Sequence, residues 1–304
     1  MLAVLRRLVL GAYERSLERD IIDPPSHVAV IQDGNRRYAR QAGQSVVDGH
    51  REGAETSEQI LEWCHDIGVK ELTLYAFSTE NFDRPPEQQE YLFDLITEKL
   101  DELADHPDIH DNEVAIRAIG DIERLPLRVK RAAQYAEERT ENYRSFRLNV
   151  ALAYGGRAEL LTASRDIAAD VASGTLDPDA IDVGEIERRL YDGVVTDVDL
   201  IIRTGGNERT SNFLPWHANG NEAAVYFCHP YWPEFSKRDF LRAIRTYQYR
   251  EQRWHQSRAE RAVSILRAVG EQEVPLARSI LQSRSDSRSD EPGTNDPPHK
   301  DTAD

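Results

Sequence analysis

The sequence predicts an α/β fold with a six-stranded, mainly parallel sheet flanked by helices. Six short segments rich in Val, Ile, Leu, Phe and Tyr alternate with longer segments of helical periodicity. Helices between successive strands are the crossovers that parallel pairing requires. The length of 304 residues suits one α/β domain of roughly 250 residues with additional tails.

The predicted strands are short and apolar, as in parallel strands covered on both faces. The first is a continuous apolar run from Val28 to Ile31, and the turn Asp33-Gly34-Asn35 ends it. The six predicted strands cover residues 28–32, 71–77, 114–119, 147–153, 198–202 and 224–228.

Helical patterns occupy the segments between these strands, and several of them open on Asp, Ser or Pro. The predicted helices cover residues 51–66, 87–104, 123–140, 157–173, 184–191 and 237–268. The stretch from Arg84 to His110 has the pattern of a mobile lid or arm. The apolar face of its helix comprises Tyr91, Leu92, Leu95, Ile96, Leu100 and Leu103. This face would either pack into the core or form the wall of a lipophilic channel.

We expect three parts along the chain: an N-terminal amphipathic helix (1–23), a catalytic domain (24–270) and a mostly disordered C-terminal tail (271–304). The first helix is expected to pack on its own domain, with contact to a membrane surface as the second interpretation. The tail is rich in Ser, Arg, Asp and Pro and has too few apolar residues to offset the entropy of folding.

Composition excludes several classes of protein. The net charge of −16 argues against a nucleic-acid-binding protein. Only five of the basic residues are lysines, and such an acidic, arginine-based balance fits a protein of very high salt and an ordinary acidic cytosolic protein equally well. Cys64 and Cys228 have neither metal-ligand nor disulfide-framework spacing. No apolar run approaches a membrane span and no clear signal peptide is visible, so a cytoplasmic location is expected.

Three clusters of polar residues follow predicted strands. After the first strand, Asp33 can hold a cation such as Mg²⁺, while Arg36, Arg37 and Arg40 can neutralise phosphate oxygens. Taken alone, the turn would simply cap the next helix. After the second strand, Ser78 to Arg84 brings hydroxyl, amide and guanidinium groups to the same sheet edge, although Ser78 and Glu80 alone would be cap residues.

The third cluster runs from Arg203 to Ser211. Two arginines six residues apart are joined by a Gly-Gly turn, so guanidinium and backbone amide groups can converge on one diphosphate. Arg203 also follows an apolar run, where an unpaired charge would be costly. A lone histidine such as His50 is more often structural than catalytic.

Together these clusters resemble the cis-prenyltransferases, the undecaprenyl diphosphate synthase family, over roughly residues 24–254, and their variants resemble its archaeal branch. The matching segments are 27–37, 49–50, 77–84, 119–121, 149–157, 203–213 and 232–235. The resemblance implies a homodimer and a hydrophobic tunnel for the growing isoprenoid.

The resemblance also implies roles for individual residues. Asp33 is expected to bind Mg²⁺ at the allylic diphosphate, with His50 and Arg84 assisting. Asn81, with Ser78, is expected to take part in proton removal, although a neutral amide is a poor base and would orient substrate or relay the proton. The complete expected substrate-binding set is Gly34, Asn35, Arg36, Arg37, Tyr38, His50, Ser78, Thr79, Glu80, Phe82, Arg84, Arg203, Arg209, Thr210 and Ser211.

Three departures from the bacterial pattern affect these expectations. In the bacterial pattern an arginine precedes the Gly-His pair. This chain has Val46 at that position, so the pocket is expected to accept a different starter. Glu208 stands where the bacterial pattern has a metal-binding histidine, and it is a weak candidate that could still ligate Mg²⁺. The segment from Trp216 to Tyr226 is two residues longer, so Glu222 is only a weak candidate for the second metal ligand.

The implied reaction is sequential addition of isopentenyl diphosphate to an allylic diphosphate, geranylgeranyl or farnesyl diphosphate, giving a long polyprenyl diphosphate for glycosyl carrier lipid. Geranylgeranyl diphosphate is the favoured starter. The alternative is a non-catalytic or partner-dependent subunit, and the intact polar clusters argue against it. Product length would depend on bulky residues that close the tunnel, such as Tyr91, Phe93 and Leu100, and release would involve contact with the inner face of the membrane.

Overall fold

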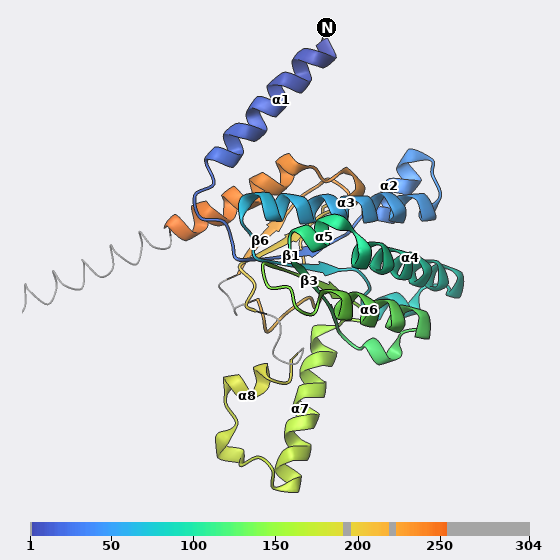
Figure 1. Cartoon of the computed structure of the whole chain (residues 1–304), viewed down its shortest axis with the longest axis vertical. Helices are drawn as coiled ribbons and strands as arrows, with labels where there is room; N and C mark the ends of the chain where they lie inside the picture. The colour runs from blue at the N-terminus through green and yellow to red at the C-terminus, as the bar shows by residue number, and fades with distance from the viewer. Residues whose placement is uncertain (1, 191–195, 219–222, 254–304) are drawn as a thin grey trace, which may run out of the picture. The chain divides into compact units, whose positions relative to one another are not determined.

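A six-stranded parallel sheet forms the centre of the fold (Figure 1). The computed structural model describes residues 2–190, 196–218 and 223–253. The strand order is β3-β4-β2-β1-β5-β6. The strands are β1 (His27–Ile31), β2 (Glu71–Tyr75), β3 (Val114–Ile119), β4 (Phe146–Ala151), β5 (Leu200–Arg203) and β6 (Ala224–Phe227). The predicted fold class and all six strands are confirmed.

Helices connect the strands, and their bounds differ more from the prediction. They are α1 (Leu2–Arg19), α2 (Asn35–Ala42), α3 (Val46–Ile67), α4 (Pro86–Asp105), α5 (Pro107–Asp111), α6 (Leu127–Thr140), α7 (Gly156–Ser173) and α8 (Val183–Glu187). Short 3₁₀ turns are η1 (Thr79–Asp83), η2 (Ile122–Arg124), η3 (Pro178–Ala180) and η5 (Trp232–Glu234). A further helix covers 237–253, and the rest of its predicted range lies outside the described residues.

Helix α3 begins five residues before its predicted start. Ser45 and Asp48 form a capping box at its N-terminus, and Gly43 in the left-handed conformation ends α2 just before it. Helix α6 begins four residues later than predicted because η2 and Pro126 precede it.

The inner strands β4, β2, β1 and β5 are buried on both faces, as the apolar strand sequences predict, whereas the edge strand β6 exposes Val225. Val28 and Val30 of β1 belong to the larger core, which includes residues of α3, α4, α6 and the 237–253 helix. Ala29 and Ile31 point to the opposite face, where Phe213 and Leu214 pack on the sheet. This alternation follows from the two-residue period of a strand.

The apolar face of helix α4 both packs into the core and lines a cavity. The helix packs along α6, where Arg128 bridges Glu90 and Asp94. Leu92, Leu95 and Leu100 are buried, and the same side chains line the cavity described below.

The second half of α1 packs on the first turns of the helix that begins at residue 237. Leu17 is fully buried, and Glu14 and Glu18 pair with Arg238 and Lys237. Within the described ranges, no helix combines the length and hydropathy that a membrane span needs. The predicted tail (271–304) lies outside these ranges.

Candidate active site

The strand order brings the three polar clusters together. Strand β1 lies between β2 and β5, so the segments that follow these three strands meet at one edge of the sheet. Asp33 comes two residues after β1, Ser78 comes three residues after β2, and Arg203 is the last residue of β5. A ligand site at the carboxyl ends of the strands is the general rule for such sheets.

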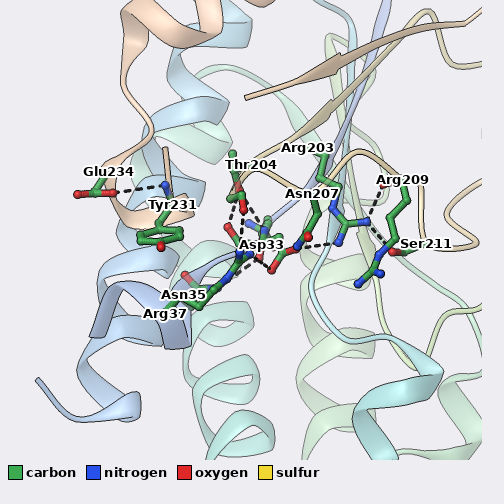
Figure 2. A network of polar contacts seen from close by, with 12 residues as sticks. Asp33, Asn35, Arg37, Arg203, Thr204, Asn207, Arg209, Ser211, Tyr231 and Glu234 are labelled. Carbon is green, nitrogen blue, oxygen red and sulfur yellow. Dashed lines mark hydrogen bonds and ion pairs between the residues drawn. The ribbon is translucent and has the colours of Figure 1, made fainter. Parts of the chain in front are cut away.

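Asp33 is at the centre of the polar network (Figure 2). Its Oδ2 accepts hydrogen bonds from Arg203 Nη2 (2.7 Å) and Asn207 Nδ2 (2.8 Å), and its Oδ1 accepts one from Arg37 Nη2 (3.1 Å). Partial burial alone would raise the pKa of Asp33, but the hydrogen bonds from Arg203 and Asn207 and the charges of Arg203 and Arg37 lower it below its usual value. Asp33 is therefore a firmly ionised carboxylate at neutral pH.

Arg203 is a buried cation whose partners fix its orientation. Only 4% of its side chain is exposed. Its Nη1 donates to the carbonyl of Arg209 (2.6 Å) and to Ser211 Oγ (2.5 Å), while Nη2 donates to Asp33. The loop from Arg203 to Ser211 is thus folded around one guanidinium, as Figure 2 shows.

Two glycines allow Arg37 and Asp33 to approach the neighbouring loops. Gly34 has φ of 113°, and an added Cβ would lie 2.7 Å from the Tyr231 ring. Gly205 has φ of 79°, and a Cβ there would lie 2.6 Å from Arg37 Nη2. Arg37 Nη1 donates to the Gly205 carbonyl at 2.8 Å.

The turn after β2 is held by its own side chains. Asn81 Oδ1 accepts a hydrogen bond from the Ser78 backbone N–H (3.2 Å), and Arg84 N donates to the Asn81 carbonyl (3.2 Å). Thr79 N donates to the carbonyl of Tyr154, which joins the turn to the segment after β4. Asn81 lines the cavity, where its NH₂ group can donate to a ligand.

His50, Arg84 and Arg36 form a cluster of basic groups beside this turn. Burial, followed by the charges of Arg84 and Arg36, lowers the pKa of His50 to about 4. Burial, and then the charge of Arg36, lowers the pKa of Arg84 to about 10. Mutual repulsion among these groups would be relieved by a bound anion.

One cavity of about 680 Å³ joins the polar groups to an apolar region. Its polar lining residues include Asp33, His50, Ser78, Asn81, Arg84, Arg157, Arg203, Arg209 and Ser211, and the ion pair of Lys99 and Glu58. Its apolar lining residues include Leu61, Leu92, Leu95, Ile96, Leu100, Leu103, Leu148 and Val150. The chemistry of the lining fits a molecule with an anionic head and a hydrocarbon tail.

The predicted site residues divide by their place around this cavity. Those that line it are Asp33, Asn35, His50, Ser78, Glu80, Asn81, Arg84, Arg203, Arg209 and Ser211, and those outside its lining are Gly34, Arg36, Arg37, Tyr38, Thr79, Phe82 and Thr210. The Tyr38 hydroxyl donates to Glu52, and the Phe82 ring packs against Phe77 and Arg124. Leu100 lines the cavity, whereas Tyr91 donates to the Val47 carbonyl and Phe93 packs against Phe77.

The structure supports neither of the two weaker metal-ligand candidates, Glu208 and Glu222. Within the described ranges, no three His, Cys, Asp or Glu side chains converge as a metal site. Glu208 is exposed and is not part of the cavity lining. Glu222 lies outside the described residues.

Three polar residues at the site were not singled out as site residues from the sequence. Asn207 donates to Asp33, Arg157 lines the cavity, and Asn212 Oδ1 accepts a hydrogen bond from the Arg157 backbone N–H at 2.9 Å. The signal was present, because all three lie inside matching segments 149–157 and 203–213.

Comparison with known proteins gives one consistent result. A family model described as "Putative undecaprenyl diphosphate synthase" matches residues 31–255. The chain is 64% identical over 271 residues to the geranylgeranyl-diphosphate-specific tritrans,polycis-undecaprenyl-diphosphate synthase of Halobacterium salinarum, with 89% of each chain covered. It is 58% identical over 281 residues to the Haloarcula marismortui protein of the same name, with 92% of each covered.

Solved structures agree with the sequence matches. Lavandulyl diphosphate synthase from Lavandula x intermedia, solved with dimethylallyl diphosphate, aligns with a TM-score of 0.69 and 33% identity, covering 74% of this chain and 95% of that one. A probable undecaprenyl diphosphate synthase from Campylobacter jejuni gives 0.60 and 31%, covering 75% and 96%. The family match spans most of the described residues and includes every polar group around Asp33, so this chain belongs to the undecaprenyl diphosphate synthase family of prenyltransferases.

Proposed function

We propose that this chain adds isopentenyl units sequentially to geranylgeranyl diphosphate and makes a long, undecaprenyl-like polyprenyl diphosphate, a precursor of glycosyl carrier lipid. The observation that carries the proposal is a cavity whose lining includes both arginines and leucines. The starter is supported by the names of the Halobacterium and Haloarcula relatives, which specify geranylgeranyl diphosphate.

The allylic diphosphate is assigned to the side of the cavity that contains Asp33, His50 and Arg84. The amides after Gly34 begin α2, whose N-terminus favours an anion. Arg36 and Arg84 repel each other without a ligand, and both would gain by sharing a diphosphate. The isopentenyl diphosphate is assigned to Arg203, Arg209 and Ser211, which already lie within one hydrogen-bonded loop.

We propose Mg²⁺ as the cofactor, with Asp33 as its protein ligand. A single ionised carboxylate together with diphosphate oxygens and water is a usual coordination set for this ion. The position of Asp33 at the cavity wall fits that role. When bound, Mg²⁺ would neutralise charge on the departing diphosphate.

The protein's task in the reaction is to stabilise the leaving group. The allylic carbon–oxygen bond breaks and its electron pair leaves with the diphosphate, while the isopentenyl double bond attacks the carbon that becomes electron-poor. Arg84 and the amides that begin α2 stabilise the developing negative charge. A proton is then lost from the new chain to form the cis double bond.

Asn81 is proposed to orient the isopentenyl group or relay the proton, with a diphosphate oxygen as the final acceptor. Its Oδ1 accepts a hydrogen bond from the Ser78 N–H, and its NH₂ group can donate to substrate. A neutral amide is a poor base, which is consistent with a positioning or relay role.

The growing chain is proposed to occupy the apolar region of the cavity, the hydrophobic tunnel of this family. Leucines from α4 and the side chains of Leu148 and Val150 from β4 would enclose it. Burial of each added methylene would contribute roughly 0.8 kcal/mol, which favours retention of the intermediate between additions.

We further propose that the protein is a cytoplasmic homodimer that contacts the inner face of the membrane when product is released. The alternative, a non-catalytic or partner-dependent subunit, would not elongate substrate by itself. The order β2-β1-β5 and the ionised Asp33 favour the enzyme, because they bring the polar groups of three segments together within one chain.

The direct test is elongation by the purified chain. The protein is incubated with labelled isopentenyl diphosphate, Mg²⁺ and either geranylgeranyl or farnesyl diphosphate, at low and at multimolar KCl, and product length and double-bond geometry are determined. Long cis products from the wild type and none from Asp33→Ala are expected. A folded wild-type protein that gives no product under any condition would favour the partner-dependent subunit.

A further inference from the structure

Gln89 links the turn after β2 to helix α4. The side-chain Nε2 of Gln89 donates to the backbone carbonyl of Phe82 at 2.8 Å and to that of Arg84 at 2.7 Å. Both amide hydrogens of this one side chain are therefore used on the same turn. The glutamine is partly buried, so these two bonds are shielded from competition by bulk water.

The two carbonyls belong to the segment that carries Asn81 and Arg84. Inside the turn, Asn81 Oδ1 holds the Ser78 N–H, and Arg84 N donates to the Asn81 carbonyl. Those contacts fix the shape of the turn, and the Thr79 N–H donates to the Tyr154 carbonyl, which ties the start of the turn to the segment after β4. The Gln89 amide adds a restraint from α4 at the other end of the turn, at Phe82 and Arg84.

Gln89 also belongs to the helical face that walls the cavity. Leu92 and Ile96 lie three and seven residues further along α4, and both line the cavity. Positions i, i+3 and i+7 share one face of a helix. A leucine would continue this apolar face, and burying a polar amide there is tolerable only because both of its hydrogens are bonded.

We infer that Gln89 is a positioning residue that sets the distance of Asn81 and Arg84 from the apolar wall of the cavity. The inference rests on the proposed function, since it assumes that Arg84 faces the allylic diphosphate. The same helix, α4, is proposed to contact the hydrocarbon chain. Through Gln89, the position of the residues that bind the diphosphate therefore depends on the position of α4.

The test compares Gln89→Met with Gln89→Glu. Methionine keeps the length and helix propensity of the side chain and removes both donors, while glutamate keeps the shape and replaces the NH₂ group by an acceptor. Gln134→Met on the exposed face of α6 is the matched control, because the Gln134 side chain donates to Glu138 on its own helix.

Three quantities are measured for each full-length variant: amide hydrogen exchange over 78–84, steady-state KM for each substrate, and the unfolding temperature. Both Gln89 variants are expected to exchange faster in this segment and to raise KM for the allylic diphosphate about tenfold or more, the scale of losing two hydrogen bonds. KM for isopentenyl diphosphate should change less than about twofold, because Arg203 and Arg209 lie on another loop. A purely structural role would lower the active fraction without moving one KM alone.

Unchanged exchange over 78–84 in both Gln89 variants would overturn the inference, and so would an equal rise in both KM values. Arg84→Ala is the reference variant for the underlying assignment. If Arg84→Ala leaves KM for the allylic diphosphate unchanged, the proposed placement of that substrate is wrong; if it raises that KM and Gln89→Met does not, only the role of Gln89 is refuted.

Discussion

Replacing Gly53 with alanine is expected to disturb the active site from within helix α3. An added Cβ would lie 2.2 Å from Asn35 Oδ1 and 2.9 Å from Trp232 Cδ1, both closer than real contacts allow. Trp232 cannot move aside easily, because it is buried and its Nε1 donates to the Gly53 carbonyl at 2.6 Å. Asn35 is restrained as well, by a hydrogen bond from its Nδ2 to the Gln32 carbonyl at 3.3 Å.

Two opposing terms set the size of the effect. Alanine is preferred over glycine in a helix interior by about 1 kcal/mol, which would stabilise the variant. Forcing an extra group into a packed contact typically costs about 1–3 kcal/mol, and the distance to Asn35 Oδ1 places this site near the upper end. We expect a net loss of about 1–2 kcal/mol in the free energy of unfolding, or a fall of about 2–8 °C in unfolding temperature.

The assay is denaturant unfolding with activity measured in parallel. Gly11→Ala is the matched control, because the nearest atom to its Cβ, Arg15 Nη1, is 3.7 Å away and only the propensity gain applies there. Gly53→Ala should also lower kcat/KM, since Asn35 lines the cavity beside Asp33. A Gly53→Ala protein that is as stable and as active as the wild type would refute the packing argument.

Three further predictions concern the cavity itself. Asn81→Ala should remove most turnover while leaving substrate affinity largely intact. Asn81→Asp should have the same effect, although its carboxylate can still accept a hydrogen bond from the Ser78 N–H. Unchanged turnover in kinetic assays would refute a role for the NH₂ group. Since burial and neighbouring arginines lower the pKa of His50 to about 4, this histidine should stay neutral in NMR titration down to about pH 5, and its contribution to stability should fall as pH drops from about 6.5 toward 4; a midpoint near 6.5 would contradict this. Inorganic diphosphate should raise that pKa. Ile96→Phe adds bulk to the cavity wall and should give shorter products, with product length determined by chromatography. Tyr91→Phe, outside the lining, should leave product length unchanged. Products of equal length from both variants would exclude this wall from control of chain length.

Most of the fold was readable from the sequence because buried parallel strands are continuous apolar runs. Helix α2 was not assigned a range, since only Ala39 of its eight residues is buried and no apolar period marks it. The prediction begins this helix at residue 51, after Gly49, a residue of low helix propensity, whereas α3 begins at Val46. Gly49 and Gly53 permit close contact with Asn35 and Trp232.

The candidate site was predictable where its functional residues lie next to a predicted strand in the sequence. Asp33, Asn81 and Arg203 each follow a strand, and the order of parallel strands then determines that they meet. Asn207 and Gln89 could not be assigned roles in this way. Each acts through a hydrogen bond to a group that is distant in sequence or belongs to the backbone, and neither partner is visible in a pattern.

The central claim is that one cavity holds the diphosphate head at Asp33 and the hydrocarbon tail along α4. A crystal structure with Mg²⁺ and a non-reactive geranylgeranyl thiodiphosphate would test it directly. We predict the diphosphate between Asp33 and Arg84, with the tail against Leu92, Ile96 and Leu100. A diphosphate bound away from Asp33, or a tail that leaves the cavity without touching α4, would contradict the account.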